Sequence, residues 1–207
     1  MQRKSTLAVM AFSAVMAVSS SQAAELWANP ITGTNPNTAN PYTAGQTVIP
    51  NITVSGIGRG AGIVGANAGN RYNAESWNTA TLDPTAYFTF TLTPSPGFTI
   101  NFENFVYTGQ ASGSGPTSFA FRSSVDSFAA NIGTPTAAGA TIVLGAPSYQ
   151  GVSTPIEFRF YGWGTTQVGG TFSINDFTFN GEVIPEPSGA LLGALGLLGL
   201  LRRRRLG

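Results

Sequence analysis

Carboxylates are the side chains of this sequence that could do acid–base chemistry. The 207 residues include no Cys and no His, which excludes Ser-His-Asp and Cys-His nucleophiles, thiolate zinc sites and imidazole metal ligands. A glycoside hydrolase needs two carboxyl groups across a cleft, and the acids in the middle of the chain are Glu75, Asp83, Glu103, Asp126, Glu157 and Asp176. Their spacing singles out no pair. A carboxylate-dependent glycoside hydrolase is therefore only a distant alternative, and we expect a non-enzymatic chain without cofactor or metal.

Aromatic residues could serve a second kind of chemistry, which is stacking against a sugar ring. Tyr161-Gly162-Trp163-Gly164 follows a predicted strand, and its glycines could leave Tyr161 and Trp163 exposed at the end of a sheet. Trp27 and Trp77 are further candidates. The structural alternative is that Trp163 closes the edge of the core. The pattern keeps a polysaccharide-binding module as the second hypothesis.

The charge distribution excludes a nucleic-acid footprint on the central part of the chain. Six of the ten basic residues lie near the ends, at Arg3, Lys4 and Arg202 to Arg205. Between them, four arginines stand against eight acids from Glu25 to Glu182, a net charge of −4. A nucleic-acid-binding surface would need clustered basic residues. Glu157 and Arg159 are two residues apart, so we expect them to form a weak surface ion pair on one strand face.

The elements that position these residues are predicted to be β-strands. Gly, Thr, Ser, Asn and Pro punctuate the body, and no segment shows the apolar spacing of a helix. Alternation is clearest where Phe88, Phe90 and Leu92 share one face of a strand. The expected strands are 46–55, 87–93, 98–107, 117–123, 140–144, 156–161 and 170–182, with a weaker one at 60–65. The prediction is an all-β, sandwich or jelly-roll-like domain, with its apolar layer in the second half and a loop-rich first half.

Two of these strands change phase, which predicts β-bulges. In 98–107 and again in 172–179 the apolar residues move from even to odd positions. One extra residue at Glu103-Asn104 or at Asn175-Asp176 would return the next aromatic residues to the core. Burial of both strand faces is the competing explanation.

Gly56-Ile57-Gly58-Arg59-Gly60-Ala61 is close to a dinucleotide fingerprint, but no helix follows it, so we expect turns or close backbone approach there.

The first 23 residues have the design of a signal peptide. Arg3 and Lys4 precede an apolar run from Leu7 to Val18, and Ser21-Gln22-Ala23 offers small residues for cleavage. The segment is expected to form a helix during export and to be cleaved after Ala23 or Ala24. The ectodomain then begins at residue 24 and extends to residue 182.

Residues 183–207 combine three zones in a fixed order. Pro185-Glu186-Pro187 precedes an apolar stretch at 188–201, which is followed by Arg202, Arg203, Arg204 and Arg205. A helix can start only after the prolines, and 188–201 gives about 21 Å of helix, short of a hydrocarbon core of about 30 Å. The arginines favour a cytoplasmic end, which leaves the ectodomain outside. A buried C-terminal helix is the alternative.

These C-terminal residues resemble the sorting signal of the PEP-CTERM family of exported bacterial proteins. The family pattern is a Pro-Glu-Pro motif, a short transmembrane helix and a basic cluster, matched here by Pro185 to Pro187, 188–201 and Arg202 to Arg205. The resemblance implies an exosortase-type membrane protease as partner, anchoring in the inner membrane before processing, and a mature form at the cell surface or outside the cell. It implies an address rather than an activity.

A second stretch is similar to the ectodomains of that group, where a strand ends in Arg-Ser-Ser-x-Asp-Gly. Here Arg122-Ser123-Ser124-Val125-Asp126 is followed by Ser127 in place of Gly. The similarity implies a jelly-roll-like fold. In physical terms, Arg122 is expected to bond a carboxylate or backbone carbonyls, and Asp126 to cap the following turn.

Overall fold

Residues 24–186 are described by the structure, a computed structural model, and they form two antiparallel β-sheets. The predicted all-β fold is confirmed. In the described residues the first sheet has seven strands, β1 (Ala24–Asn29), β2 (Thr47–Val48), β5 (Val64–Gly65), β6 (Tyr72–Glu75), β8 (Phe98–Ala111), β10 (Gly139–Val143) and β12 (Phe172–Pro185). The second has five, β3 (Ile52–Val54), β4 (Gly58–Arg59), β7 (Tyr87–Pro94), β9 (Ser118–Ser123) and β11 (Ile156–Trp163). Two 3₁₀ turns, η1 (Ser124–Asp126) and η2 (Pro147–Tyr149), complete these elements.

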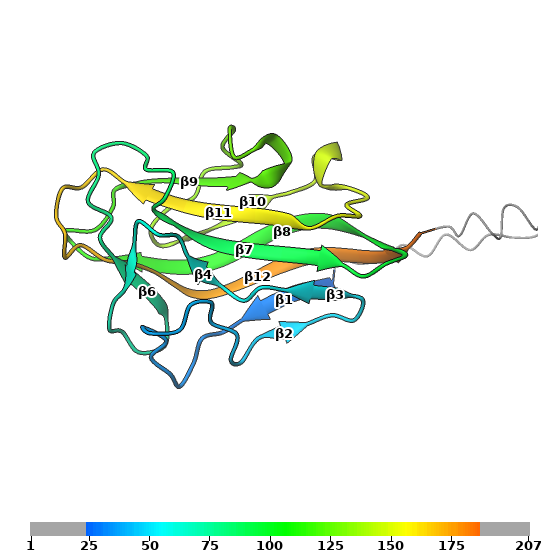
Figure 1. Cartoon of the computed structure of the whole chain (residues 1–207), viewed down its shortest axis with the longest axis horizontal. Coiled ribbons are helices and arrows are strands. Elements are labelled where there is room, and N and C mark those ends of the chain that lie inside the picture. The colour runs from blue at the N-terminus through cyan, green and yellow to red at the C-terminus, as the bar shows by residue number, and fades with distance from the viewer. Residues whose placement is uncertain (1–23, 187–207) are drawn as a thin grey trace, which may run out of the picture.

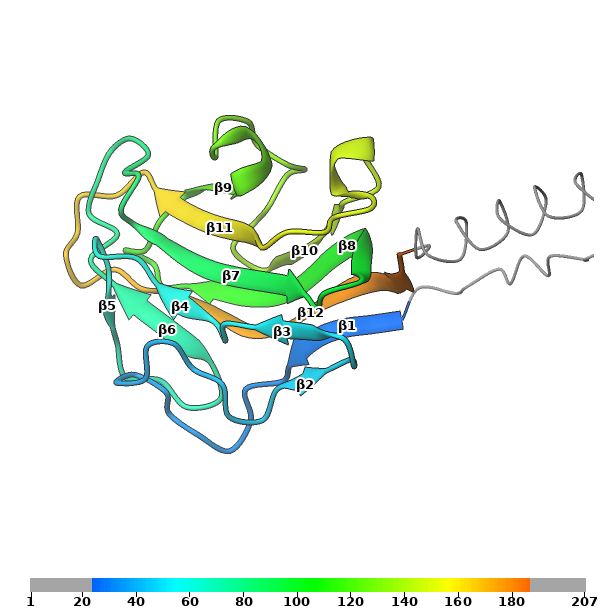
Figure 2. The same ribbon diagram turned by 45° about the vertical axis from the view of Figure 1, so that its right-hand side comes forward.

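The two sheets lie face to face as a sandwich (Figures 1 and 2). The first sheet has the order β10-β8-β12-β1-β2, with β6 also paired to β12 and β5 to β6. The second has the order β3-β7-β11-β9, with β4 also paired to β7. The longest ladder joins β8 and β12, so these two strands form the middle of the first sheet.

Aromatic side chains fill the space between the sheets. Phe88, Phe90 and Leu92 of β7 are buried while the alternate threonines are half-buried, as the period-2 pattern predicts. Rings from opposite sheets meet directly, as Phe105 and Phe121 do with centroids 4.7 Å apart and nearly parallel planes. The chain has no Cys, so no disulfide can stabilise this core, and its packing must supply the stability.

Both predicted bulges are present. Along the β8–β12 ladder, Asn180 faces Asn104 while Gly181 faces Phe102, so Glu103 is the extra residue of β8. Ile174 faces Gly109 while Asp176 faces Thr108, so Asn175 is the extra residue of β12. Each bulge returns the following aromatic residues to the core, and burial of both faces is not needed to explain the phase changes.

The first half of the body contributes more to the core than the sequence predicted. β1 and β6 were not expected as strands, yet Leu26, Trp27 and Tyr72 are fully buried. The expected strand 46–55 is divided into β2 and β3, which belong to different sheets. Pro50 and Asn51 separate them, and Asn51 has a φ of 68°, so the chain turns there and crosses the sandwich. The weaker strand predicted at 60–65 is represented by β5 at its end, with β4 just before it.

The glycines of the stretch 56–61 lie at the edge of the second sheet. A Cβ atom at Gly60 would come within 2.4 Å of the Thr85 carbonyl oxygen, and one at Gly58 within 2.9 Å of the Thr89 side chain. Close backbone approach therefore explains these glycines, as expected.

The strand–turn segment around Arg122 has the predicted hydrogen bonds. Arg122 Nη1 donates to the Phe128 carbonyl oxygen at 3.0 Å, and its Nε donates to Asn131 Oδ1 at 2.8 Å. The Asp126 carboxylate accepts hydrogen bonds from the N–H groups of Ala129 and Ala130. The turn is thus fixed by its own polar groups.

Ser127 stands where the resemblance noted in the sequence predicts glycine, and its φ is 58°. A left-handed conformation costs about 1–2 kcal/mol for a residue with a Cβ, while glycine adds about 0.5–1 kcal/mol of unfolded-state entropy. Ser127→Gly should therefore raise the free energy of unfolding by about 0.5–1 kcal/mol. Urea unfolding of residues 24–186, followed by tryptophan fluorescence, measures this difference.

Ser148 provides the matched control, because it is exposed within η2 and has no positive φ. Ser148→Gly should lower the free energy of unfolding by about 0.5–1 kcal/mol. Equal losses in the two variants would refute the argument from the left-handed conformation.

Candidate functional site

The predicted sorting motif begins at the end of the last strand. Pro185 is the final residue of β12 and faces Phe98 of β8. The N–H of Glu186 donates to the Gly97 carbonyl oxygen at 2.8 Å. Pro187, the predicted apolar helix at 188–201 and Arg202 to Arg205 lie outside the described residues, as does the predicted signal peptide at 1–23. β12 also continues three residues past the predicted end of the strand at 182.

Both ends of the described chain leave from the same end of the sandwich. β1 runs antiparallel to β12, with Ala24 opposite Gly181, and Figure 2 shows the start of β1 beside the end of β12. Within residues 24–186, no helix has the length and hydropathy that crossing a membrane requires. The opposite end of the sandwich carries the loops between β6 and β7 and between β11 and β12 (Figure 1).

The aromatic residues considered for sugar stacking are mostly buried. Trp27 and Trp77 are fully buried in the core, and Tyr161 is only 2% exposed. Burial raises the pKa of Tyr161, against the opposing effect of the Arg159 hydrogen bond and charge. Trp163 is half-buried. The structure therefore leaves Trp163 as the accessible member of the predicted pair, without a second exposed ring beside it.

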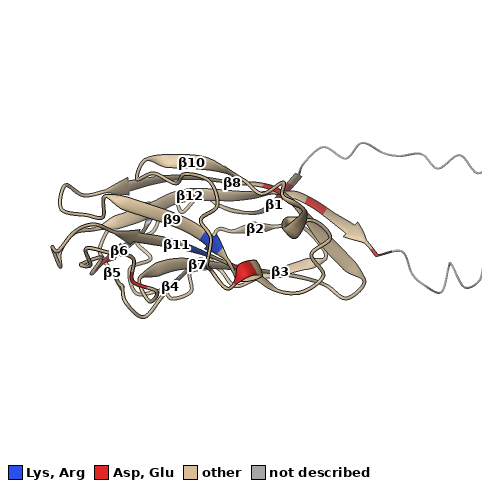
Figure 3. Cartoon of the chain, turned by 90° about the horizontal axis from the view of Figure 1, so that it is seen from above, with Lys and Arg blue, Asp and Glu red and all other residues tan. Residues whose placement is uncertain are grey.

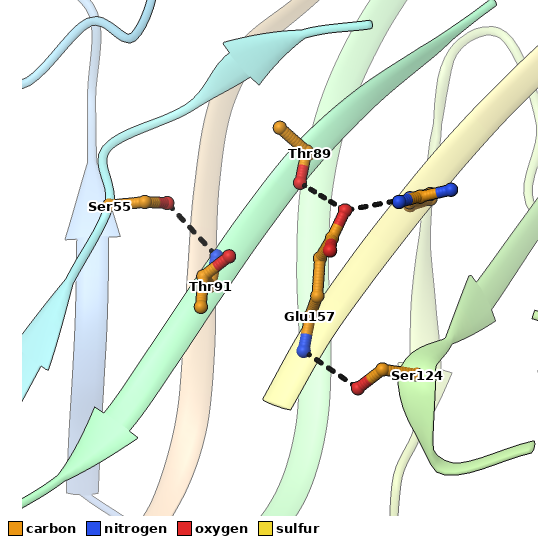
Figure 4. Close-up of polar contacts among 6 residues, drawn as sticks. Ser55, Thr89, Thr91, Ser124 and Glu157 are labelled. Carbon is orange, nitrogen blue, oxygen red and sulfur yellow. Dashed lines mark hydrogen bonds and ion pairs between the residues drawn. The ribbon is translucent and has the colours of Figure 1, made fainter. Parts of the chain in front are cut away.

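Glu157 and Arg159 form the predicted ion pair on the outer face of the second sheet. Arg159 Nε lies 2.7 Å from Glu157 Oε1, and the two side chains are 23% and 29% exposed. Thr89 Oγ1 donates to the same carboxylate oxygen at 3.0 Å, and the Glu157 N–H donates to Ser124 Oγ (Figure 4). Nearby, the Thr91 N–H donates to Ser55 Oγ. These contacts tie the outer face of β7 and β11 to the flanking segments.

Aromatic rings cover the Arg159 guanidinium, so this ion pair is less solvated than the sequence suggested. Its Cζ atom lies 3.8 Å from the centroid of Phe128 and 4.3 Å from that of Tyr87. Burial by itself would lower the pKa of Arg159, but hydrogen bonds to Glu157 and Tyr161 and the charge of Glu157 raise it overall. The cluster has the features of a structural support for the loop after β9.

One depression brings two carboxylates together, which the sequence did not predict. Glu103 and Glu182 line a hollow of about 360 Å³, together with Asn101 and Gln150. Glu182 was not among the acids considered, and Glu103 is the bulged residue of β8. Only the register across β8 and β12 could have revealed that they meet. Within residues 24–186 there is no group of three or more His, Cys, Asp or Glu side chains that could hold a metal ion.

A second depression is lined almost entirely by polar side chains and lies on the outer face of the first sheet. Its volume is about 210 Å³. Asn73, Ser173 and Gln110 form its floor as a cross-strand row on β6, β12 and β8. Arg71 and Asn67, from the segment before β6, also line it. We call it the Arg71 pocket.

Among residues 24–186, Arg71 is the only charged residue that lines this pocket. Charged side chains are sparse on the described part of the chain in general, as the mostly tan ribbon of Figure 3 shows. The sequence did not predict the pocket, because residues 67–71 and 110–112 are far apart in sequence and are brought together only by the sheet.

Comparison of the chain with protein-family models, with curated proteins and with solved structures finds no match.

Proposed function

We propose that this chain is an exported, non-enzymatic protein of the cell surface or extracellular matrix, sorted through its C-terminal Pro-Glu-Pro, apolar and arginine zones. The observation that carries the proposal is the order of these three zones directly after the last strand. β12 ends at Pro185, the first residue of the motif. The last strand of the sandwich therefore ends where the proposed address begins.

The position of the two ends supports the same proposal. The start of β1 and the end of β12 lie together at one end of the sandwich. A signal peptide before residue 24 and an anchor after residue 186 would then attach to a membrane from the same side. The positive-inside rule keeps Arg202 to Arg205 in the cytoplasm and leaves the sandwich outside.

The proposed partner is an exosortase-type membrane protease that processes the tail near Pro185-Glu186-Pro187. A double substitution, Glu186→Gln with Pro187→Ala, tests this without touching the strand, because both residues follow β12. In a producer that contains such a protease, we expect the wild-type chain in processed form at the surface or in the medium. The double variant should accumulate unprocessed in the inner membrane.

Pro147→Ala is the matched control, since Pro147 is an exposed proline in η2, remote in sequence from the motif. This variant should be processed like the wild type. Processing of the double variant at the wild-type rate, or retention of the wild-type chain in the cytoplasm, would overturn the proposal.

A further inference from the structure

We propose that the Arg71 pocket binds a carboxylate-bearing sugar, such as a uronic acid unit of a polysaccharide. The inference concerns a ligand and goes beyond the sorting address, which it does not require. It rests on which hydrogen-bonding groups of the pocket are already used within the protein and which remain for a ligand.

The amide oxygens of two residues that line the pocket, Asn67 and Gln110, are occupied by neighbouring side chains. Asn67 Oδ1 accepts from Asn37 Nδ2 at 2.7 Å and from Asn35 Nδ2 at 3.2 Å. Gln110 Oε1 accepts from Arg71 Nη1. With these oxygens engaged, the Nδ2 group of Asn67 and the Nε2 group of Gln110 are the parts of the two amides that remain for a ligand.

The guanidinium adds a charge to these donors. Arg71 is half-buried, and its Nε and Nη1 are held by the Gly69 carbonyl oxygen and by Gln110. Its Nη2 has no hydrogen-bond partner within residues 24–186. The pocket is thus lined by residues with unused guanidinium and amide N–H groups, the kind of donor that forms charge-assisted hydrogen bonds with a carboxylate.

Asn73 gives an independent indication of a ligand. The residue is 6% exposed, and its side chain lines the pocket. Within the described residues its side-chain amide has no hydrogen-bond partner, and its polar atoms are not among the fully buried unpaired ones, so a molecule in the pocket can reach them. Ser173 beside it is 1% exposed, and its hydroxyl already donates to Asn175 Oδ1 at 2.9 Å and to the Gln110 carbonyl oxygen at 3.3 Å, so it offers the ligand no free donor. A hydroxyl group of a sugar would supply a hydrogen-bond partner for the Asn73 amide.

The size and location of the pocket agree with a sugar unit. The pocket has a volume of about 210 Å³, below the usual range of about 300–1,000 Å³ for drug-sized ligands, so it would hold only a small unit of a larger ligand. No aromatic ring is among its lining residues, so a sugar would be bound through hydrogen bonds and not through stacking. Ser173 and Pro185 are separated along β12 by about 40 Å, because a strand rises about 3.3 Å per residue. The pocket therefore lies far from the C-terminal tail. A long polymer can reach it there.

Calorimetric titration of the full chain, in a detergent without a sugar head group, tests the inference. The probes are a glucuronic acid oligomer, a glucose oligomer of the same length, and acetate. We expect saturable binding of the acidic oligomer and at least about tenfold weaker binding of the other two, since the acidic oligomer alone combines charge-assisted hydrogen bonds with hydroxyl contacts. Binding of acetate or the neutral oligomer with equal affinity would overturn the proposal, as would no saturable binding of the acidic oligomer.

Substitutions locate the site. Arg71→Gln should weaken binding of the acidic oligomer by at least about tenfold. Gln110→Glu changes an exposed residue and places a negative charge beside Arg71, so it should have a similar effect without removing the arginine. Arg122→Gln removes the same charge from the other sheet and should change the affinity less than about twofold. Equal losses for Arg71→Gln and Arg122→Gln would show non-specific charge attraction and refute the site.

Discussion

Replacing Phe105 with alanine is expected to lower the free energy of unfolding by about 3–5 kcal/mol. Phe105 belongs to β8 and is fully buried. It contacts rings of both sheets, at centroid distances of 4.5 Å to Phe179, 4.7 Å to Phe121, 5.2 Å to Phe90 and 5.5 Å to Tyr107. The variant therefore loses buried apolar area and leaves a cavity where the two sheets are held together.

Phe98 is the matched control for this substitution. It begins the same strand but is only half-buried, and it forms no ring pair with another aromatic residue within the described part of the chain. Phe98→Ala should cost about 1 kcal/mol or less. Urea unfolding of residues 24–186 compares the two variants. A loss for Phe105→Ala no larger than that for Phe98→Ala would contradict the account of the core.

Arg59→Met is expected to destabilise the fold by a similar amount, about 3–5 kcal/mol, although it places an apolar side chain of similar length in the core. Arg59 is 8% exposed and has no carboxylate partner among residues 24–186. Its guanidinium donates to four backbone carbonyls, those of Pro36, Asn37, Ala39 and Asn73. Burial lowers the pKa of Arg59, while the charge and hydrogen bond of Tyr72 act in the opposite direction.

Removing Arg59 abolishes five hydrogen bonds from a charged donor, and each such bond contributes about 1.5–3 kcal/mol. The carbonyl oxygens of Pro36, Ala39 and Asn73 each keep another donor, whereas that of Asn37 has no other among residues 24–186. Arg59 also lies over the Tyr72 ring, with Cζ 3.7 Å from its centroid, and this contact is lost as well. Arg71→Met is the control, because Arg71 is half-buried at the surface and should lose about 1 kcal/mol or less. Equal effects of the two substitutions on the urea midpoint would refute a structural role for Arg59.

The sequence predicted well the strands in which aromatic residues alternate with polar ones. β7, β9 and β11 each show this period, and the phase changes in β8 and β12 predicted the bulges at Glu103-Asn104 and at Asn175-Asp176. Alternation is a local property, so it can be read without knowing the neighbours of a strand.

The first half of the body was harder to predict because its structure depends on distant partners. β1 is a strand because it pairs with β12 at the other end of the body, and β6 because it pairs with the start of β12. Arg59 is buried because the loop at 36–39 closes over it. Short segments of this kind show no clear alternation of their own, and their strand structure depends on the neighbours with which they pair.

The candidate sites, too, could be predicted from the sequence only where their residues lie close together on one strand. The sequence identified the Glu157–Arg159 pair, since both residues share one strand face. It could not show that Tyr161 is covered, because the covering groups, Tyr87 and Arg122, come from the neighbouring strands β7 and β9. The Arg71 pocket combines residues up to about a hundred positions apart, and only the register of β6, β12 and β8 brings them together.

The most direct test of the proposed sorting function is the intact mass of the protein recovered from the surface or medium of its producer. Removal of both ends predicts a chain that begins at residue 24 or 25 and ends near Pro185-Glu186-Pro187, with the whole sandwich retained. A mass equal to that of all 207 residues, in protein recovered outside the inner membrane, would contradict processing at either end.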